Sequence, residues 1–272
     1  MPRFLTALPV FNEVAHVDAV LDEVLRFTPD VMVVDDGSTD GTSRRLADRI
    51  EARGDVRVVR HPRNLGYGAA LATAFREALS GGWDGLVTID CDGQHQPRLI
   101  PEFLAALFDP AMAADIVSGS RYLRRFPGDS QPPEARRRIN ATITSEINDR
   151  LGLRITDAFC GFKAYSRRAL TALNVSETGY AMPLEVWVQA AVAGLSIVEL
   201  PVPLLYLDLT RSFGGALDDA ETRLAHYRSV LDRAETAAGF SLRGHRADVP
   251  GGPPAGVPDA TASQDPVAAA HC

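Results

Sequence analysis

Two aspartates separated by one residue, Asp90 and Asp92, have the most specific chemistry in this sequence. They follow a short apolar run, so they are expected at a strand end, where side chains two residues apart point the same way. Two carboxylates aimed at one point repel each other unless a cation lies between them. Oxygen ligands of this kind select Mg²⁺ or Mn²⁺, which commonly share a site with substrate phosphates. The pair predicts such a metal site, although two solvated aspartates in a polar turn would show the same spacing. His95, close by, fits either a metal ligand or a bond within the loop.

A second acidic pair, Asp35 and Asp36, closes an earlier apolar run and precedes Gly37–Gly41. A carboxylate at a strand end can accept N–H groups from a nucleobase. A side chain of Ser38–Asp40 is expected to cap the next helix. The alternative for the pair is that one aspartate caps that helix and the other faces water. Receiver domains also use an acidic pair, but theirs follows the first strand. They also need an aspartate after the third strand, where this chain has Arg60-His61-Pro62, so that class is set aside.

Basic side chains that could contact phosphate lie later in the chain. They are Arg121, the run Arg136–Arg138, Lys163 and Arg211. A run of charges on a helix is also typical of a solvated face. Lys163 is the only lysine, and a GC-rich genome explains that bias as well as phosphate binding does. Asp157, beside an apolar turn that contains glycine, could act as a cap or as a base.

The first half of the chain alternates short apolar runs with amphipathic helical patterns. Runs of strand length cover residues 4–8, 31–34, 56–59 and 86–89, and apolar residues between them recur at spacings of three and four. This order predicts an α/β, Rossmann-like fold with a mostly parallel sheet and helices on both faces. Ligands of such sheets bind at the carboxyl ends of the strands, where Asn12–Glu13 and both acidic pairs fall. Gly66-Tyr67-Gly68 opens the third helical pattern but lacks the third glycine of a dinucleotide fingerprint.

The second half of the chain has a different character. A polar segment at 122–133 is longer than most connections, which is typical of a functional lid or of a disordered loop. Helices are expected at 134–151 and from about 183, a strand at 197–206, and a last amphipathic stripe over 217–231. From about 244 the chain is mostly Gly, Pro, Ala and Asp, which predicts a disordered tail. We therefore divide the chain into a domain at 1–243 and a tail at 244–272.

Composition and charge exclude several classes of protein. A net charge of −7 over 272 residues argues against a general nucleic-acid binder. Three cysteines are too few and too scattered for a disulfide framework, so a reducing compartment is expected. No run reaches the ~18 apolar residues of a membrane span, and the first residues lack a signal-peptide pattern. These features predict a soluble cytoplasmic protein, with attachment to the inner face of a membrane left open.

Six blocks, taken together, resemble the family 2 glycosyltransferases of the GT-A fold. The blocks are Leu8–Glu13, Val33–Thr42, Asn64–Gly68, Ile89–Gln94, Gly119–Tyr122 and Cys160–Lys163. Among these enzymes the chain is most similar to the polyprenyl- (dolichyl-) phosphate mannosyl- and glucosyltransferases, from about residue 3 to 235. The sequence departs from their pattern at Phe213, where a basic residue is common, and it lacks the carboxy-terminal membrane helices that many members carry. Both departures concern the lipid acceptor.

The resemblance implies a role for several residues. Those expected at the nucleobase and ribose are Pro9, Phe11, Glu13 and Asp36, with Asp35 as an alternative. Those expected at the metal, Mg²⁺ or Mn²⁺, and at the diphosphate are Asp90, Asp92 and Gln94. Those expected at a phosphate of the acceptor or donor are Arg121 and Arg138 (or Arg137), with Arg211 closing over it.

The implied reaction is transfer of a sugar, with inversion, from GDP-mannose or UDP-glucose to an acceptor. A polyprenyl phosphate is already an anion and needs no general base, whereas a hydroxyl acceptor needs one, for which Asp157 is the candidate. Two rivals remain. A nucleotidyltransferase usually has a glycine-rich basic loop after its first strand, where this chain has Pro9–Glu13. A module that binds a nucleotide sugar without turning it over would be separated from an enzyme by product formation.

Overall fold

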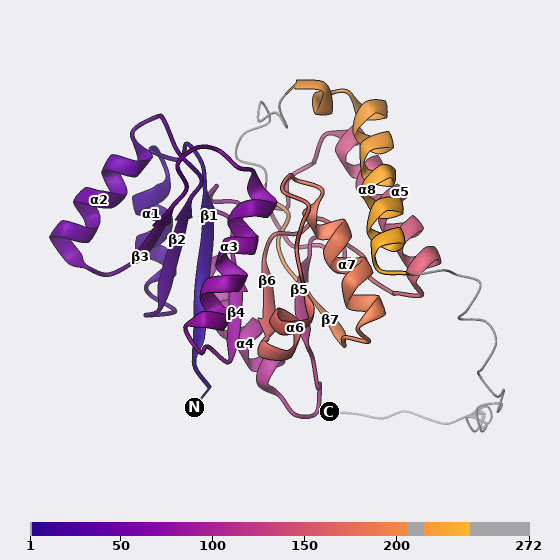
Figure 1. Ribbon diagram of the computed structural model, residues 1–272, viewed down its shortest axis with the longest axis horizontal. Coiled ribbons are helices and arrows are strands. Elements are labelled where there is room, and N and C mark those ends of the chain that lie inside the picture. Colours follow the sequence, from indigo (N-terminus) through magenta and orange to yellow (C-terminus); the bar gives the residue numbers. More distant parts are fainter. Residues whose placement is uncertain (1, 206–214, 240–272) are drawn as a thin grey trace, which may run out of the picture. The chain divides into compact units, whose positions relative to one another are not determined.

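The computed structural model describes residues 2–205 and 215–239, and within them a seven-stranded sheet forms the centre of the fold (Figure 1). Its strand order is β3-β2-β1-β4-β6-β5-β7. The strands are β1 (Phe4–Val10), β2 (Val31–Asp35), β3 (Arg57–Arg60), β4 (Gly85–Thr88), β5 (Ile116–Ser120), β6 (Lys163–Ser166) and β7 (Ile197–Pro201). The predicted α/β class is confirmed, and the first four strands along the chain pair in parallel.

The sheet is mixed because β6 runs antiparallel to both of its neighbours, β4 and β5. The sequence patterns had not separated β5 and β6 as strands. Each is short, and β5 contains Ser118, Gly119 and Ser120 in place of large apolar residues. A side chain at Gly119 would press on Cys160 Sγ and Phe162 O, so the close approach of β5 and β6 requires a glycine there. The strand expected at 197–206 ends at Pro201.

Helices cover both faces of the sheet, as expected. One face packs against α1 (Val17–Val24), α2 (Thr42–Arg53) and α4 (Ile100–Phe108), the other against α3 (Tyr67–Ser80), α6 (Arg167–Ala172) and α7 (Met182–Val192). Alternation along β1 decides which residue meets which layer. Leu5 and Ala7 contact the α3 side, whereas Leu8 and Val10 contact the α1 side.

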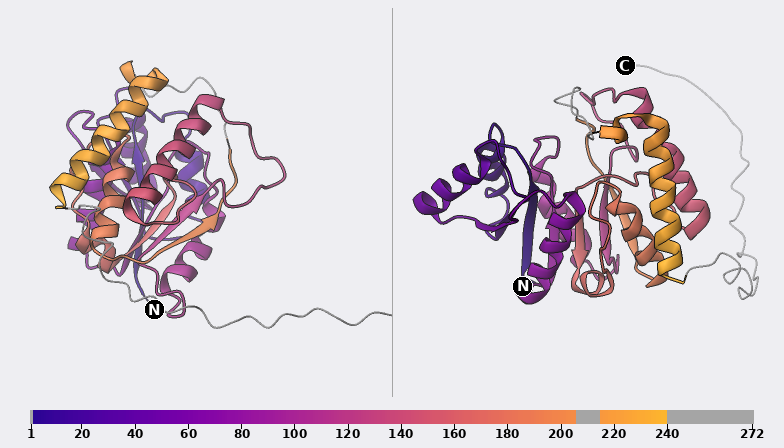
Figure 2. Two further views of the ribbon diagram at one scale, coloured as in Figure 1. Left: turned by 90° about the vertical axis from the view of Figure 1, so that its right-hand side faces the viewer. Right: turned by 45° about the horizontal axis from the view of Figure 1, so that its top comes forward.

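A third layer lies outside α7. Helices α5 (Glu134–Leu151) and α8 (Ala220–Ala237) pack on α7 and on each other, with Ile143, Trp187 and Leu231 fully buried among them (Figures 1 and 2). Short 3₁₀ turns, η1 (Pro97–Leu99) and η2 (Gly215–Asp218), precede α4 and α8. No helix within the described ranges is both long and apolar enough to cross a membrane. The predicted tail at 244–272 lies outside these ranges, so the predicted domain division stays a prediction.

Loops at the carboxyl ends of β1 and β2 are bonded to each other. Asn12 adopts a left-handed backbone conformation (φ 57°), and its amide oxygen accepts a bond from Thr39 N at 2.8 Å. Asn12 N donates to Ser38 Oγ at 3.0 Å, and Glu13 N donates to Thr42 Oγ1 at 2.9 Å. The two loops therefore form one rigid edge, and it faces the site described next.

Candidate active site

A cavity of about 730 Å³ opens at the carboxyl ends of β1, β2, β4 and β5. Its volume is within the range of small-molecule sites. Eight of the residues predicted for the site line it: Pro9, Phe11, Glu13, Asp36, Asp90, Asp92, Gln94 and Arg121. Four strand ends that are distant in the sequence thus meet at one cavity, as the crevice rule for such sheets requires.

Asp90 is held as an anion at the floor of this cavity. Tyr67 Oη donates to its Oδ1 at 3.0 Å, and His95 Nε2 lies 3.1 Å from its Oδ2. Burial by itself raises the pKa of Asp90, but the His95 and Tyr67 bonds and the Lys163 charge outweigh it and leave that pKa below its ordinary value. Of the two possibilities for His95, the structure shows the bond within the loop.

The acidic pair has the donor chemistry of a magnesium or manganese site. Asp92 lines the same cavity as Asp90, and its Oδ1 accepts a bond from Gln94 N at 2.9 Å. Any side chain at Gly161 would overlap the Asp90 carboxylate, so glycine keeps that place open. The described residues contain no group of three or more His, Cys, Asp or Glu side chains that could enclose a metal. Two carboxylates and an amide oxygen leave positions for ligand phosphates, which is a common environment of Mg²⁺.

The two carboxylates after β2 have different roles. Asp35 is fully buried outside the cavity lining and accepts bonds from Ser38 N at 2.9 Å and from Ser43 Oγ. It shapes the turn that leads to α2, whose N-cap is Gly41 without a side-chain cap, so Asp35 neither caps the helix nor lines the cavity where a nucleobase would bind. Asp36 does line the cavity.

Asp36 organises the loop before α3. Its carboxylate accepts bonds from Leu65 N at 2.9 Å and Gly66 N at 2.8 Å, and its Oδ1 lies 2.7 Å from His61 Nδ1. The other ring nitrogen of His61 lies 2.9 Å from Thr73 Oγ1 on α3. His61 therefore connects Asp36 to α3, a role that the sequence patterns did not predict.

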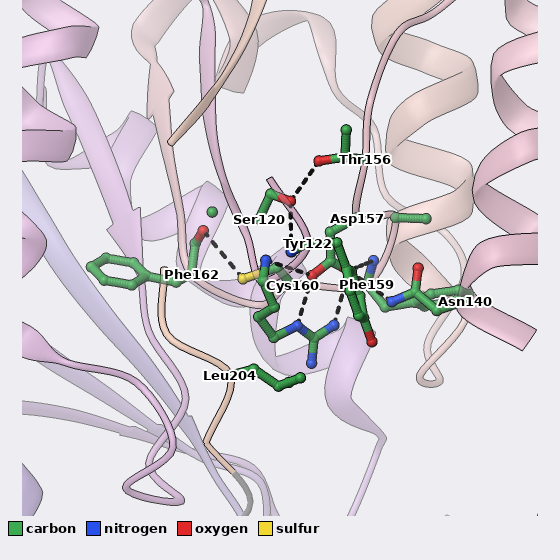
Figure 3. Close-up of polar contacts among 12 residues, drawn as sticks. Ser120, Tyr122, Asn140, Thr156, Asp157, Phe159, Cys160, Phe162 and Leu204 are labelled. Atoms are coloured by element: carbon green, nitrogen blue, oxygen red, sulfur yellow. Dashed lines mark hydrogen bonds and ion pairs between the residues drawn. The ribbon is translucent and has the colours of Figure 1, made fainter. Parts of the chain in front are cut away.

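Arg121, which lines the cavity, forms an ion pair with the buried Asp157, and Figure 3 shows Asp157 among its polar contacts. Arg121 Nε and Nη2 donate to the two carboxylate oxygens of Asp157 at 2.7 and 2.9 Å, and Arg121 N donates at 3.2 Å. Asn140 Nδ2 adds a bond at 2.8 Å. Burial by itself raises the pKa of Asp157, but the Arg121 charge and these bonds outweigh it and lower that pKa to about 2.

This geometry does not support Asp157 as a general base. The carboxyl is 0% exposed, is absent from the cavity lining, and already accepts a bidentate guanidinium. A base with a pKa near 2 would bind a proton too weakly to assist transfer at neutral pH. Asp157 instead fixes the guanidinium of Arg121 at the cavity wall.

Helical phase corrects the choice among the arginines at the start of α5. Arg136 lines the cavity together with Ile139 and Asn140, at spacings of three and four. Arg138, the predicted phosphate ligand, is exposed and outside the cavity lining, as is Arg137. Arg211, the other predicted phosphate ligand, lies outside the described residues.

Comparison with known proteins assigns the family. Residues 6–173 match the family described as Glycosyl transferase family 2. The chain belongs to this family. It is 32% identical over 234 residues to an undecaprenyl-phosphate mannosyltransferase of Micrococcus luteus, covering 83% of this chain and 93% of the relative. It is also 32% identical over 246 residues to a polyprenol monophosphomannose synthase of Mycolicibacterium smegmatis, covering 85% and 90%.

The structural comparison supports the same fold. A glucosyl-3-phosphoglycerate synthase of Mycobacterium tuberculosis, solved with Mn²⁺, UDP-glucose and phosphoglyceric acid, matches with a TM-score of 0.64. It is 20% identical, and the match covers 89% of this chain and 82% of that one. The GT-A fold is therefore confirmed, and the protein is an enzyme of the glycosyltransferase class, as the sequence motifs predicted.

Several cavity residues of this glycosyltransferase were missed from the sequence. Arg223 and Tyr227 line the cavity from α8, one helical turn apart. Arg223 is buried, and its Nη1 donates to Leu217 O at 2.6 Å. Tyr67 and Tyr180 stack with ring centroids 5.8 Å apart, and both line the cavity. The amphipathic stripe of α8 was visible, but nothing local showed that its polar border would face a cavity.

Proposed function

We propose that this glycosyltransferase moves mannose, with inversion, from GDP-mannose to a polyprenyl phosphate in a reaction that depends on Mg²⁺ or Mn²⁺. One observation carries the choice of acceptor. The carboxyl that could have served a hydroxyl acceptor is buried in a pair with Arg121, whereas Arg121, Arg136 and Arg223 line the cavity. A site rich in arginine suits an acceptor that is already an anion. Both relatives named above act on mannose and a polyprenyl carrier according to their names.

The donor is assigned to the acidic half of the cavity. Pro9, Phe11 and Glu13 after β1, with Asp36 after β2, surround the place proposed for the nucleobase and ribose. Phe11 is 40% exposed, so its ring is available for stacking on a base. Asp36 acts there by holding the loop at Leu65 and Gly66 through the bonds described above.

Asp90, Asp92 and Gln94 are the residues that would hold the metal ion. When bound, the ion neutralises the charge that develops on the departing diphosphate. Tyr67 and His95 keep Asp90 ionised and oriented before the donor arrives.

Arginines position the acceptor in this proposal. An oxygen of the polyprenyl phosphate attacks the anomeric carbon, a carbon–oxygen bond forms, and the bond to the nucleoside diphosphate breaks with its electrons on that leaving group. Arg121, fixed by Asp157, and Arg136 orient the attacking phosphate, so that a bimolecular step takes place within one cavity. Because the acceptor lipid resides in a membrane, we place the reaction at the inner face of the cell membrane, with the protein in peripheral contact.

A donor and acceptor matrix tests this function. Purified protein is incubated with GDP-mannose, UDP-glucose or UDP-GlcNAc, each with Mn²⁺, Mg²⁺ or EDTA. The acceptors are a short-chain polyprenyl phosphate, the matching polyprenol and 3-phosphoglycerate. We expect a mannosyl lipid from GDP-mannose and the polyprenyl phosphate with metal only. Equal transfer to the polyprenol would contradict the phosphate acceptor, and product with UDP-glucose alone would contradict the donor.

A further inference from the structure

Among the described residues, exposed arginines without an acidic partner gather between β5 and α5. The side chains of Tyr122–Arg125 are exposed in succession, and Arg137 and Arg138 are exposed at the start of α5. We call these six residues the basic rim. None of its four arginines forms an ion pair with another described residue. The rim borders the cavity, because Arg121, Tyr122 and Arg136 line it.

Arginines on the opposite side of the sheet provide the contrast. On α2, Arg44 lies near Asp48 (4.0 Å), Arg45 pairs with Asp18, and Arg53 pairs with Asp22 (2.8 Å). Within the part of the chain that the structure describes, the arginines of α2 thus have acidic partners and those of the rim have none, although the net charge is −7. The unpaired charge of the rim is a local property and not a result of composition.

Local acids do not neutralise the basic rim. Between residues 121 and 138 the sequence has six arginines and two acidic residues, Asp129 and Glu134. The Asp129 carboxylate accepts bonds from Phe126 N at 2.7 Å and Leu204 N at 2.9 Å, so it is used in shaping the loop. Figure 2 (left) shows the segment between β5 and α5 as a loop that stands away from the sheet and helices.

Apolar side chains share this loop with the arginines. Leu123 is 45% exposed and Tyr122 is 36% exposed, directly before Arg124 and Arg125. An aromatic and an aliphatic side chain next to two cations match a membrane interface, where apolar groups enter the headgroup layer and arginines bind lipid phosphates. A nucleic-acid surface would need a wider basic footprint than this chain has.

We propose that the basic rim binds the surface of a bilayer that contains anionic lipids and so brings the cavity mouth to its acceptor. This inference rests on the proposed function in one respect, because a lipid acceptor requires the protein to reach a membrane. Charge complementarity, exposure and the position of the rim at the cavity carry the rest.

Vesicle co-sedimentation tests the rim directly. Wild-type protein is mixed with vesicles of phosphatidylcholine and phosphatidylglycerol, or of phosphatidylcholine alone, in the absence of substrates. We expect binding to the anionic vesicles that weakens with salt. The triple variant Leu123→Ser, Arg124→Ser, Arg125→Ser should bind at least about 25-fold more weakly, since each basic residue near an anionic surface contributes about fivefold. The matched control, Arg44→Ser with Arg53→Ser, removes the same charge from α2 and should bind within about twofold of wild type.

Activity separates failure of the rim from failure of the proposed function. The triple variant should keep its rate with a short-chain polyprenyl phosphate in solution and lose rate when the acceptor is in anionic vesicles. Vesicle binding that depends on the rim, without any sugar transfer, would contradict the proposed function and still support the rim proposal. The rim proposal is overturned if wild type ignores the vesicles, if the α2 control loses as much binding, or if a DNA duplex binds the rim as tightly as the vesicles do.

Discussion

The acidic and basic halves of the cavity are held in place in different ways. Carboxylates of the acidic half, such as Asp36 and Asp92, accept bonds from backbone N–H groups of their own or neighbouring loops. In the basic half, formed by Arg121, Arg136 and Arg223, the guanidinium of Arg121 is anchored by the side chain of Asp157, 36 residues away. Asp36 and Asp92 are therefore held by the backbone of loops at one edge of the sheet, whereas the basic half depends on how β5, α5 and α8 pack together.

This difference has a consequence for specificity. Turns after β1, β2 and β4 are fixed by the sheet, so the acidic half can present one arrangement to a nucleotide and a metal. Arg136 and Arg223 of the basic half lie on α5 and α8, which pack mainly on α7 and on each other. We infer that acceptor binding is the more sensitive of the two to mutations in the helical layer.

The largest expected effect comes from removing Asp92, the carboxylate of the acidic half that we propose as a metal ligand. Asp92→Ala should lower the rate of transfer by roughly 10³-fold, because charge stabilisation at the leaving group is lost. It should also abolish the metal-dependent rise in melting temperature with GDP-mannose. Asp48→Asn, which neutralises an exposed acid on α2, is the control and should leave both unchanged. A variant Asp92→Ala that still showed the metal-dependent shift would move the metal elsewhere.

The next effect tests whether the basic half depends on distant anchoring. Asp157→Asn leaves Arg121 without its buried counterion, which typically costs roughly 3–5 kcal/mol of stability. We expect about a 100-fold loss in kcat/KM for the phosphate acceptor, with the nucleotide-induced thermal shift retained. Arg121→Gln combined with Asp157→Asn should be less destabilised than the two single effects added together, measured by denaturant unfolding. Strict additivity would show that the pair does not act as a unit.

The pH dependence of the same pair has a definite sign. The pKa of Asp157 is lowered to about 2 in the folded protein, below its unfolded value. Its contribution to stability is therefore complete above about pH 4 and is lost as the pH falls toward 2. Wild type and Asp157→Asn should show rate profiles of the same shape between pH 5 and 9. An acid limb in that range that disappears in Asp157→Asn would restore Asp157 as a base.

Sequence reasoning recovered the acidic half because its residues are local to strand ends. An apolar run followed at once by Asp90 and Asp92 predicts both the strand and the site residues within six or seven positions. The antiparallel direction of β6 was not predictable, because the four residues Lys163–Ser166 show no alternation of apolar and polar side chains that would indicate an antiparallel strand. Asp157 was misread for a similar reason, because its role depends on a partner that only the fold brings near.

The choice between Arg136 and Arg138 could have been made from the sequence. Ile139, Ile143 and Ile147 mark the buried face of α5, and Arg136 continues that face one turn earlier. The spacing of these isoleucines separates Arg136, on the buried side of the helix, from the other two arginines of the run. By contrast, no local signal indicated that Arg223 would reach the same cavity.

A smaller effect is expected from single arginine substitutions in the basic half. Arg136→Gln should lower kcat/KM for a short-chain polyprenyl phosphate by roughly 10- to 100-fold, which is the value of one charged hydrogen bond. Arg138→Gln on the exposed side of the same helix should change it less than twofold, and steady-state kinetics with varied acceptor measures both. If the two variants lose equal activity, α5 acts on the acceptor through the electrostatic field of its positive charges and not through one positioned arginine.

The smallest expected effect lies in the acidic half, at a residue outside the cavity lining. His61 is buried between Asp36 and Thr73, and Asp36 in turn holds the backbone at Leu65 and Gly66. His61→Asn should raise KM for GDP-mannose about fivefold with kcat retained, because only the loop beside the proposed nucleotide site loosens. KM for the acceptor should not move, and Thr73→Val, which removes the outer bond, should show a weaker form of the same pattern. A fall in kcat without a change in KM for the donor would mean that the loop at Asp36 affects the reacting atoms and not only donor binding. The two halves of the cavity would then not act independently.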